Sequence, residues 1–422
     1  MSLVSSLFTG VTGLLGNSKA MNIIGDNISN VNTVGFKSSK AVFSDIFSTI
    51  LTNGSVTSQL GRGSQLQGVI QAFGQGSFET SSNALDLAID GSGFFVTSDG
   101  TGNFYTRAGQ FRLNDDGLVQ AITGEILQGQ RITNGVTSAT VEDIDLAGVQ
   151  SAPQASTQFT LGANLDTSAS AGTTFTTPIT LFNSVGDTVI LSYSWVKSAS
   201  PANTWGFSIS SNQGTVSTLN GASATSGSVT FDTSGALSSV SVNGTALASL
   251  ADIPIVISFA STNPTAQDLN VTWDIATGTA SNGKLTGYAA ASNNNSLVQN
   301  GFTTGTLTGL SVDNAGVISG LFNNGQTENL FAVTLADFLA PSGLTRRGSN
   351  LFSESAESGQ PTLGLAQTGG IGSVIGNTLE LSNVDLAAEF VTMIQTQQAF
   401  QASARIISTT DDLLTETVNL VR

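Results

Sequence analysis

Turn dipeptides through the middle of this chain restrict what it can fold into. Asn-Gly begins at Asn53, Asn134, Asn220, Asn243, Asn282, Asn300 and Asn324, and Asp-Gly begins at Asp90, Asp99 and Asp116. These pairs favour two-residue hairpin turns, because both central residues of such a turn need a positive φ. The runs between them alternate apolar and polar side chains, as over 188–196. The middle of the chain is therefore predicted to form short antiparallel strands.

The two ends of the sequence have a helical apolar pattern instead. Apolar residues recur there in steps of four and three, which is typical of a coiled-coil seam and is more regular at the C-terminal end. We expect the two stripes to pack against each other, with Ser382 or Asn383 as N-cap of the second helix and Asp385 in its first turn. The first stripe is Leu7, Val11, Leu14, Met21 and Ile28; the second is Leu386, Phe390, Met393, Phe400, Ile407, Leu414 and Val418.

Glycine and the lack of charge set these helices apart from ordinary surface helices. Gly10, Gly13 and Gly16 each weaken the first helix by about 1 kcal/mol relative to Ala. The stretch 390–404 has no charged side chain, which indicates a helix surrounded by other protein. The plainer alternative is an antiparallel pair inside one chain.

Composition excludes several classes of function. Only 10% of the residues are charged, and 13 basic against 29 acidic residues give a net charge of −16. Binding to nucleic acid or to an anionic membrane needs a basic face, so neither is expected. The sequence has no Cys and no His, which removes thiolate and imidazole chemistry. The carboxylate pairs, such as Asp115 with Asp116, are expected to be solvated, and we expect no enzyme, cofactor, metal site or small-molecule substrate.

Shifts in composition suggest nested domains. The segment from 141 to 283 holds nine acidic residues and one base, whereas the flanks on either side share Asp-bearing turns that end in Gly. We expect an α+β, mostly β fold: a coiled-coil-like core of the terminal helices with two nested discontinuous β domains of barrel or sandwich type. The expected boundaries are 1–70 and 365–422 for the helical core, 71–147 and 285–364 for an inner β domain, and 148–284 for an inserted outer β domain.

Five separated motifs, in order along the sequence, resemble the bacterial flagellar rod and hook family of axial proteins. The first is Asn27-Ile28-Ser29-Asn30-Val31-Asn32-Thr33-Val34-Gly35-Phe36-Lys37. The others begin at Asp86, Tyr105, Asn324 and Leu379. The large insertion and the Val-Asp-Leu-Ala-Ala-Glu-Phe motif after Asn383 are more similar to hook than to rod members of the family. The resemblance covers roughly 1–147 and 285–422.

This resemblance implies a structural subunit of the bacterial flagellar hook. Such proteins leave the cell through the flagellar type III export apparatus without a cleaved signal peptide. They polymerise outside the cell into a curved hollow tube that acts as a universal joint and transmits torque from rod to filament. The implied partners are further copies in a helical homopolymer, the distal rod protein, the hook cap protein and the hook–filament junction protein. A distal rod subunit and a secreted glycan-binding β protein are the alternatives.

The resemblance also suggests roles for single residues in assembly. The two helical stripes would then pack both within and between subunits, and the ends would become helical only on assembly. Gly35 is expected to adopt a backbone conformation closed to other residues, and Phe36 to anchor the segment after the helix. Asn27 and Asn30 would cap backbone groups. Thr33 and Lys37 complete the motif.

Overall fold

The computed structural model describes residues 3–46, 49–53, 56–259, 266–277 and 280–420. The protein divides into two compact units. Unit 1 comprises Met1–Gly148, Gly309–Leu321 and Thr327–Arg422, and unit 2 comprises Val149–Thr308 and Phe322–Gln326. Within the described ranges, neither helix combines the length and apolarity that a membrane crossing requires.

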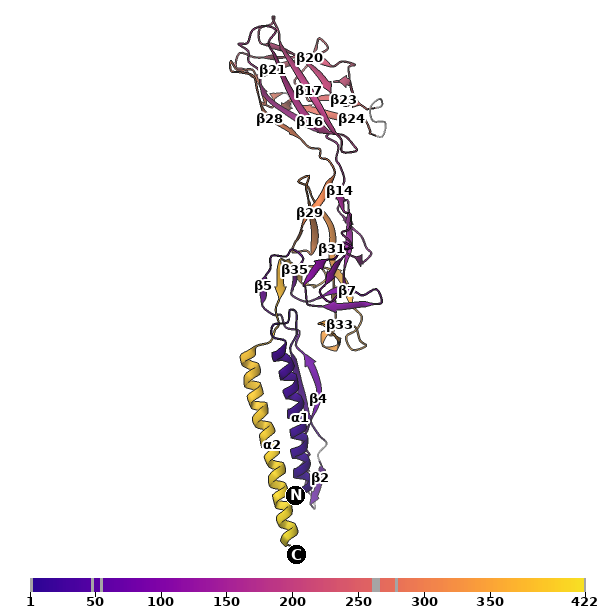
Figure 1. Cartoon of the computed structure of the whole chain (residues 1–422), viewed down its shortest axis with the longest axis vertical. Coiled ribbons are helices and arrows are strands. Elements are labelled where there is room, and N and C mark those ends of the chain that lie inside the picture. Colours follow the sequence, from indigo (N-terminus) through magenta and orange to yellow (C-terminus); the bar gives the residue numbers. More distant parts are fainter. Residues whose placement is uncertain (1–2, 47–48, 54–55, 260–265, 278–279, 421–422) are drawn as a thin grey trace. The chain divides into compact units, whose positions relative to one another are not determined.

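The long helices α1 (Leu3–Ser29) and α2 (Leu386–Leu420) lie side by side in unit 1 (Figure 1). They run antiparallel, because Gly10 lies against Ile407 whereas Asn27 bonds Glu389. The antiparallel pair is therefore present within one chain, whereas the ends were expected to become helical only on assembly. The N-cap of α2 is Asp385, whose Oδ1 accepts bonds from the N–H groups of Ala387 (2.9 Å) and Ala388 (3.2 Å). The expected cap at Ser382 or Asn383 was wrong.

A β ribbon follows α1. Strand β1 (Ser39–Asp45) pairs antiparallel with β4 (Ser64–Gln71), and β2 (Thr49–Asn53) pairs with β3 (Val56–Leu60). Both β1 and β4 contact α1. An isolated two-stranded ribbon is only marginally stable in water. Packing against α1 therefore stabilises the β1–β4 pair.

The main sheet of unit 1 is built from both sequence flanks of unit 2. Its order is β29-β30-β31-β11-β7-β8-β33-β32, and β31 pairs with both β11 and β7. Strands from the two flanks therefore share one sheet, which is the nesting that the composition suggested. The path strands are β7 (Phe94–Ser98), β8 (Asn103–Thr106), β11 (Ile126–Thr133), β29 (Gly305–Val312), β30 (Val317–Phe322), β31 (Thr327–Asp337), β32 (Thr345–Gly348) and β33 (Leu351–Ser353).

Shorter elements complete unit 1. The turn after β31 contains a 3₁₀ helix, η1 (Pro341–Gly343). Beside the main sheet lie β9 (Phe111–Leu113), β10 (Val119–Ala121), β12 (Val136–Thr137), β13 (Glu142–Asp143) and β34 (Thr362–Leu365). Two further pairs join the sequence ends: β5 (Phe78–Thr80) with β36 (Thr378–Glu380), and β6 (Leu87–Asp90) with β35 (Ser373–Gly376). These pairs hold the segment that leads into α2 against the β body of unit 1.

Unit 2 is a β-sandwich. One sheet has the order β19-β23-β24-β15-β27 with β28 also on β15, and the other has the order β16-β17-β18-β20-β21-β22. The first contains β15 (Gln158–Asn164), β19 (Thr215–Leu219), β23 (Ile253–Ser258), β24 (Leu269–Asp274), β27 (Leu285–Thr286) and β28 (Asn293–Gln299). The second contains β16 (Thr174–Phe182), β17 (Thr188–Lys197), β18 (Thr204–Ser211), β20 (Ser226–Phe231), β21 (Leu237–Val242) and β22 (Thr245–Ala246). Strands β25 (Ala276–Thr277) and β26 (Ala280–Ser281) pair with each other, and β14 (Gln150–Ser151) pairs with β29 at Gly305 and Thr306.

Aromatic side chains from both sheets fill the sandwich. Tyr193, Trp195 and Trp273 are fully buried and pack together, with ring centroids 5.0 Å apart for Tyr193 and Trp273. The fold is thus mostly β with paired terminal helices, as the sequence predicted. The expected outer boundary at 284 differs from the structure, because β27 and β28 pair with β15 and belong to unit 2.

Candidate assembly site

Small residues of α1 let the other elements approach it closely. A Cβ atom on Gly10 would come within 2.9 Å of Ile407 Cγ1, and one on Gly13 within 2.9 Å of Ser403 Oγ. A Cβ on Gly16 would meet the ring of Phe43 at 3.2 Å. These glycines lower helix propensity, but here they set the contact distance between α1 and its neighbours.

The most buried face of α1 is not the predicted stripe. Ala20, Ile24 and Asn27 are 6%, 6% and 1% exposed. The predicted residues Leu7, Val11, Leu14, Met21 and Ile28 are all half-buried. The closest contacts use small side chains because bulky ones would hold the helices further apart.

The predicted stripe on α2 divides into two groups. Met393, Phe400, Ile407 and Leu414 are half-buried, and they alternate with the buried Thr396 and Thr410. In contrast, Leu386, Phe390 and Val418 are exposed by 40%, 50% and 63%. These three side chains are therefore largely uncovered within one chain, and the expected packing of the stripe between subunits stays a prediction.

Polar side chains fix the end of α1. Asn27 Nδ2 donates to the carbonyl of Ser39 (2.8 Å) and to Glu389 Oε1 (2.9 Å), and its Oδ1 accepts from the N–H of Ser39 (2.9 Å). Asn27 therefore joins α1, β1 and α2. Asn30 Nδ2 donates to the carbonyl of Asp26 (2.9 Å), and Thr33 donates to Asn30 Oδ1 (3.1 Å). Both asparagines bond backbone groups, as the sequence suggested.

Gly35 and Phe36 are held tightly after this turn. Gly35 has a φ of +69°, and a Cβ there would lie 2.5 Å from the backbone nitrogen of Ala108. A side chain is thus excluded both by conformation and by space. Its N–H donates to the carbonyl of Glu380 (2.8 Å). Phe36 is 2% exposed, with the guanidinium of Arg346 5.3 Å from its ring centroid.

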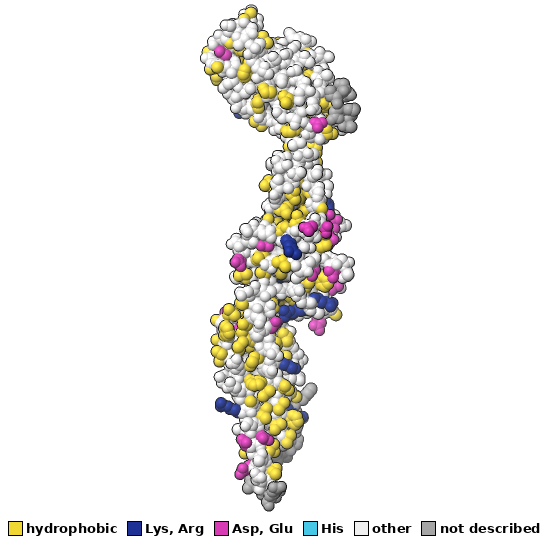
Figure 2. All heavy atoms as spheres, in the orientation of Figure 1, with side chains coloured by type: hydrophobic (Ala, Val, Ile, Leu, Met, Phe, Trp, Pro, Cys, Tyr) yellow, Lys and Arg dark blue, Asp and Glu magenta, His cyan; other side chains and the backbone are white. Residues whose placement is uncertain are grey.

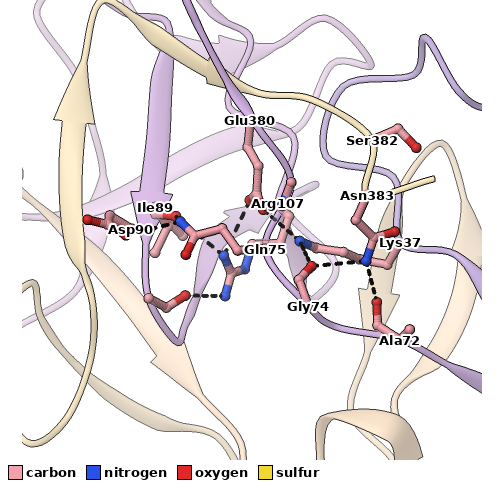
Figure 3. A network of polar contacts seen from close by, with 12 residues as sticks. Lys37, Ala72, Gly74, Gln75, Ile89, Asp90, Arg107, Glu380, Ser382 and Asn383 are labelled. Carbon is pink, nitrogen blue, oxygen red and sulfur yellow. Dashed lines mark hydrogen bonds and ion pairs between the residues drawn. The ribbon is translucent and has the colours of Figure 1, made fainter. Parts of the chain in front are cut away.

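A buried ion triad joins three distant segments (Figure 3). Lys37 Nζ lies 2.7 Å from Glu380 Oε1, and Arg107 NH1 lies 3.3 Å from Glu380 Oε2. The Lys37 and Glu380 side chains are fully buried and that of Arg107 is 5% exposed. Lys37 precedes β1, Arg107 follows β8 and Glu380 ends β36. The triad therefore connects α1, the main sheet and the segment before α2.

Backbone groups add further hydrogen bonds to the triad. Lys37 Nζ also donates to the carbonyl of Gly74 (2.9 Å), and Arg107 NH2 to that of Gly91 (2.7 Å). Glu380 Oε1 also accepts the N–H of Gly76 (2.9 Å). Burial lowers the pKa of Lys37, and the charge of Glu380 opposes that shift. Charges this deep need all their partners, so the triad fixes the local geometry.

Sequence reasoning missed the roles of Arg107, Glu380 and Asn383. Asn383 is no helix cap: its Oδ1 accepts the N–H of Ser38 (2.8 Å) and its Nδ2 donates to the carbonyl of Ala72 (2.7 Å). All three residues lie in motifs that the sequence singled out. The available signal was that only 10% of the residues are charged. An acidic and a basic residue that both lie in these motifs could therefore have indicated an ion pair.

An apolar set stays uncovered on the helices (Figure 2). We call it the exposed helix set, and each member is at least 40% exposed. Phe390, Val391 and Ile394 form its densest part, near the start of α2. The set comprises Val4, Phe8 and Leu15 on α1, and Leu386, Phe390, Val391, Ile394, Ile406, Leu413 and Val418 on α2.

Four family models match this protein. They are the flagella basal body rod protein (7–37), the flagellar hook protein FlgE/F/G D1 domain (88–164), the flagellar basal body protein FlaE D2 domain (153–302) and the flagellar basal body rod FlgEFG protein C-terminal region (376–420). The first ends at Lys37 and the last contains Glu380, so the buried triad joins the terminal matches.

Whole-length relatives decide the family. The flagellar hook protein FlgE of Borreliella burgdorferi is 30% identical over 99% of this chain and 100% of that protein. The chain belongs to the flagellar hook protein family. The FlgE protein of Treponema pallidum is also 30% identical, over the full length of both proteins. A crystal structure of Helicobacter pylori flagellar hook protein FlgE2 aligns with 70% of this chain and 98% of that protein, at 14% identity and a TM-score of 0.41.

Membership of this family makes the protein a structural subunit of the flagellar hook. The unit 2 sandwich corresponds closely to the D2 match at 153–302. Among the described residues, no group of acidic side chains is arranged to hold a metal ion.

Proposed function

We propose that the exposed helix set is the surface through which this hook subunit polymerises with further copies of itself. The observation that carries the proposal is Phe390, Val391 and Ile394, which leave 50%, 55% and 57% of their surface uncovered on one turn of α2. Contiguous exposed apolar side chains usually mark an interaction site. Apart from Glu389, which accepts a bond from Asn27, the neighbouring polar side chains on α2 are Gln and Thr, which suits burial between subunits better than a charged surface would.

The polymer is proposed to be the curved hollow tube of the flagellar hook. In this proposal it lies outside the cell, where it acts as a universal joint between rod and filament. The subunit would be exported through the flagellar type III apparatus without a cleaved signal peptide. It would meet the distal rod protein at one end of the tube, and the hook cap and then the hook–filament junction protein at the other. Family membership supports these partners.

Adding charge to the exposed helix set tests the proposal. The double variant Phe390→Asp with Ile394→Asp places two carboxylates where apolar contacts would form between subunits, and burying unpaired charge is costly. Because both side chains are exposed in the single subunit, the monomer should keep its helical circular dichroism. Electron microscopy should then show no tubes.

The matched control is Gln395→Asp, which adds a carboxylate to the same helix at an exposed polar position. This variant should still form curved tubes. Normal tubes from the double variant would refute the assembly surface. Loss of tubes from the control as well would show that added negative charge, and not the apolar set, blocks assembly.

A further inference from the structure

The Asn-Gly turns divide into two groups, and we propose that Asn134, Asn220 and Asn243 are sites of spontaneous deamidation. In this reaction the backbone nitrogen of the glycine forms a bond to Cγ of the preceding asparagine. The bond between Cγ and Nδ2 of that asparagine breaks, and Nδ2 leaves as ammonia with the glycine amide proton. Water then opens the cyclic imide to aspartate or isoaspartate. Asparagine is accordingly among the thermolabile residues.

The reaction needs two groups that are free. The glycine N–H must be available, because its nitrogen is the nucleophile, and the asparagine amide must be able to rotate toward it. A hydrogen bond to either group has to break before the ring closes, and breaking it raises the activation barrier of deamidation. The hydrogen bonds at each turn therefore predict which asparagines deamidate faster and which more slowly.

Asn134, Asn220 and Asn243 meet both conditions. All are exposed at turns, with φ values of +53°, +50° and +50°. Within the described ranges, neither their side-chain amides nor the following glycine N–H groups form a hydrogen bond. No described atom lies within 4 Å of the Cβ positions of the three glycines that follow them, so the space beside each turn is open.

Asn282 and Asn300 are restrained at both groups. Asn282 Nδ2 donates to the carbonyl of Asp274 (2.9 Å), and the N–H of Gly283 donates to Ser281 Oγ (3.1 Å). Asn300 Nδ2 donates to Thr157 Oγ1 (2.7 Å), and its Oδ1 accepts the N–H of Thr157 (2.9 Å). The N–H of Gly301 donates to Oε1 of Gln299 (2.5 Å).

Asn324 is restrained in the same way. Its Nδ2 donates to the carbonyl of Thr303 (2.9 Å), and the N–H of Gly325 donates to the carbonyl of Phe322 (3.0 Å). Asn53 is followed by a residue outside the described ranges and is not ranked. Identical dipeptides thus occupy two different environments in one molecule.

Conversion would change the turns it occurs in. Each event adds one negative charge to a protein whose net charge is already −16. Isoaspartate also inserts an extra methylene into the backbone. Asn134 lies in the β11–β12 turn, where Thr133 pairs with Val136, and Asn243 lies in the β21–β22 turn, where Val242 pairs with Thr245. Because a two-residue turn fixes the register of its hairpin, isoaspartate would disrupt these pairings.

Peptide mapping of the full-length protein tests the proposal. The folded protein is incubated at mildly alkaline pH in ¹⁸O-labelled water, which marks each converted asparagine, and the six sites are followed by mass spectrometry. Asn282, Asn300 and Asn324 must each give up at least two hydrogen bonds, so they should convert about tenfold more slowly than the other three.

Two controls separate structure from local sequence. In urea, where the turns are lost, all six sites should convert at similar rates. Ser281→Ala removes the acceptor of the Gly283 N–H and should speed conversion at Asn282 while leaving Asn300 unchanged. Equal rates at all six sites in the folded protein would overturn the proposal. So would a folded protein in which Asn134, Asn220 and Asn243 stay intact while they convert in the unfolded one.

Discussion

The sandwich of unit 2 and the helix pair of unit 1 use apolar side chains in opposite ways. In unit 2, Trp195, Trp205 and Trp273 are all completely buried. On the helices, Phe8 and Phe390 are 56% and 50% exposed. The sandwich completes its core within one molecule, whereas the helix pair leaves apolar surface for something else to cover. The same sequence therefore contains one region that needs no partner to close its core and one that does.

Tryptophan makes this difference measurable. The protein has 3 Trp residues, and all of them lie in the unit 2 core. Their fluorescence therefore reports unit 2, whereas circular dichroism of the helical signal reports α1 and α2. The two signals can be followed in a single urea titration.

The largest effect is expected from Glu380→Ala in unit 1. This change leaves Lys37 and Arg107 buried without their counter-ion, which should cost about 3–5 kcal/mol. The helical transition should move to lower urea, and the tryptophan transition should stay in place. Glu142→Ala is the control, because the Arg131–Glu142 pair is 45% and 42% exposed and such pairs contribute about 0–1 kcal/mol. A tryptophan transition that moves as far as the helical one would show that the units unfold together.

A cavity in the sandwich should give the reverse pattern. Leu191 is fully buried on β17, and Leu191→Ala should destabilise unit 2 by about 2–5 kcal/mol. The tryptophan transition should shift while the helical one does not. Ile190→Ala, at the adjacent position that is 37% exposed, should cause a much smaller shift. Equal shifts from the two variants would contradict the burial difference.

The smallest effects are expected from two glycines of α1. Gly25 has no described atom within 4 Å of its Cβ position, so Gly25→Ala should stabilise the helix pair by about 0.5–1 kcal/mol through helix propensity. Gly10→Ala gains the same propensity but forces a contact with Ile407, and overpacking costs about 1–3 kcal/mol. The urea concentration at the midpoint of the helical transition should therefore rise for Gly25→Ala, and it should fall or stay the same for Gly10→Ala. A rise for both would show that α2 can move away from Gly10.

How far the sequence predicted this fold depends on the range of the interaction. Hairpin turns, the left-handed Gly35 and the bond of Asn30 to the carbonyl of Asp26 follow from local chemistry, and the structure contains all three. The N-cap was placed wrongly because Ser382, Asn383 and Asp385 are all competent caps, and long-range bonds from Asn383 to the segments after α1 and β4 decided among them. The outer boundary also depends on a long-range pairing, that of β28 with β15.

The assembly residues show the same limit. A periodic stripe on α2 was visible in the sequence, but its division into packed and exposed members depends on how far α1 extends and at what distance it lies. Glycines were interpreted as weak helix formers, although Gly10 and Gly13 control that distance. The triad of Lys37, Arg107 and Glu380 could not be derived, because its members are separated by most of the sequence.

That separation has a consequence for the order in which the protein can acquire its structure. Lys37 and Arg107 are supplied early during synthesis, and the carboxylate that neutralises them comes 343 residues after Lys37. Until residue 380 is available, closing the region around both cations would bury two positive charges with no counter-ion, which is strongly unfavourable. The N-terminal region of a growing polypeptide therefore does not fold around these two cations early in synthesis. The region around Lys37 and Arg107 can therefore complete its structure only after the segment that carries Glu380 has been made.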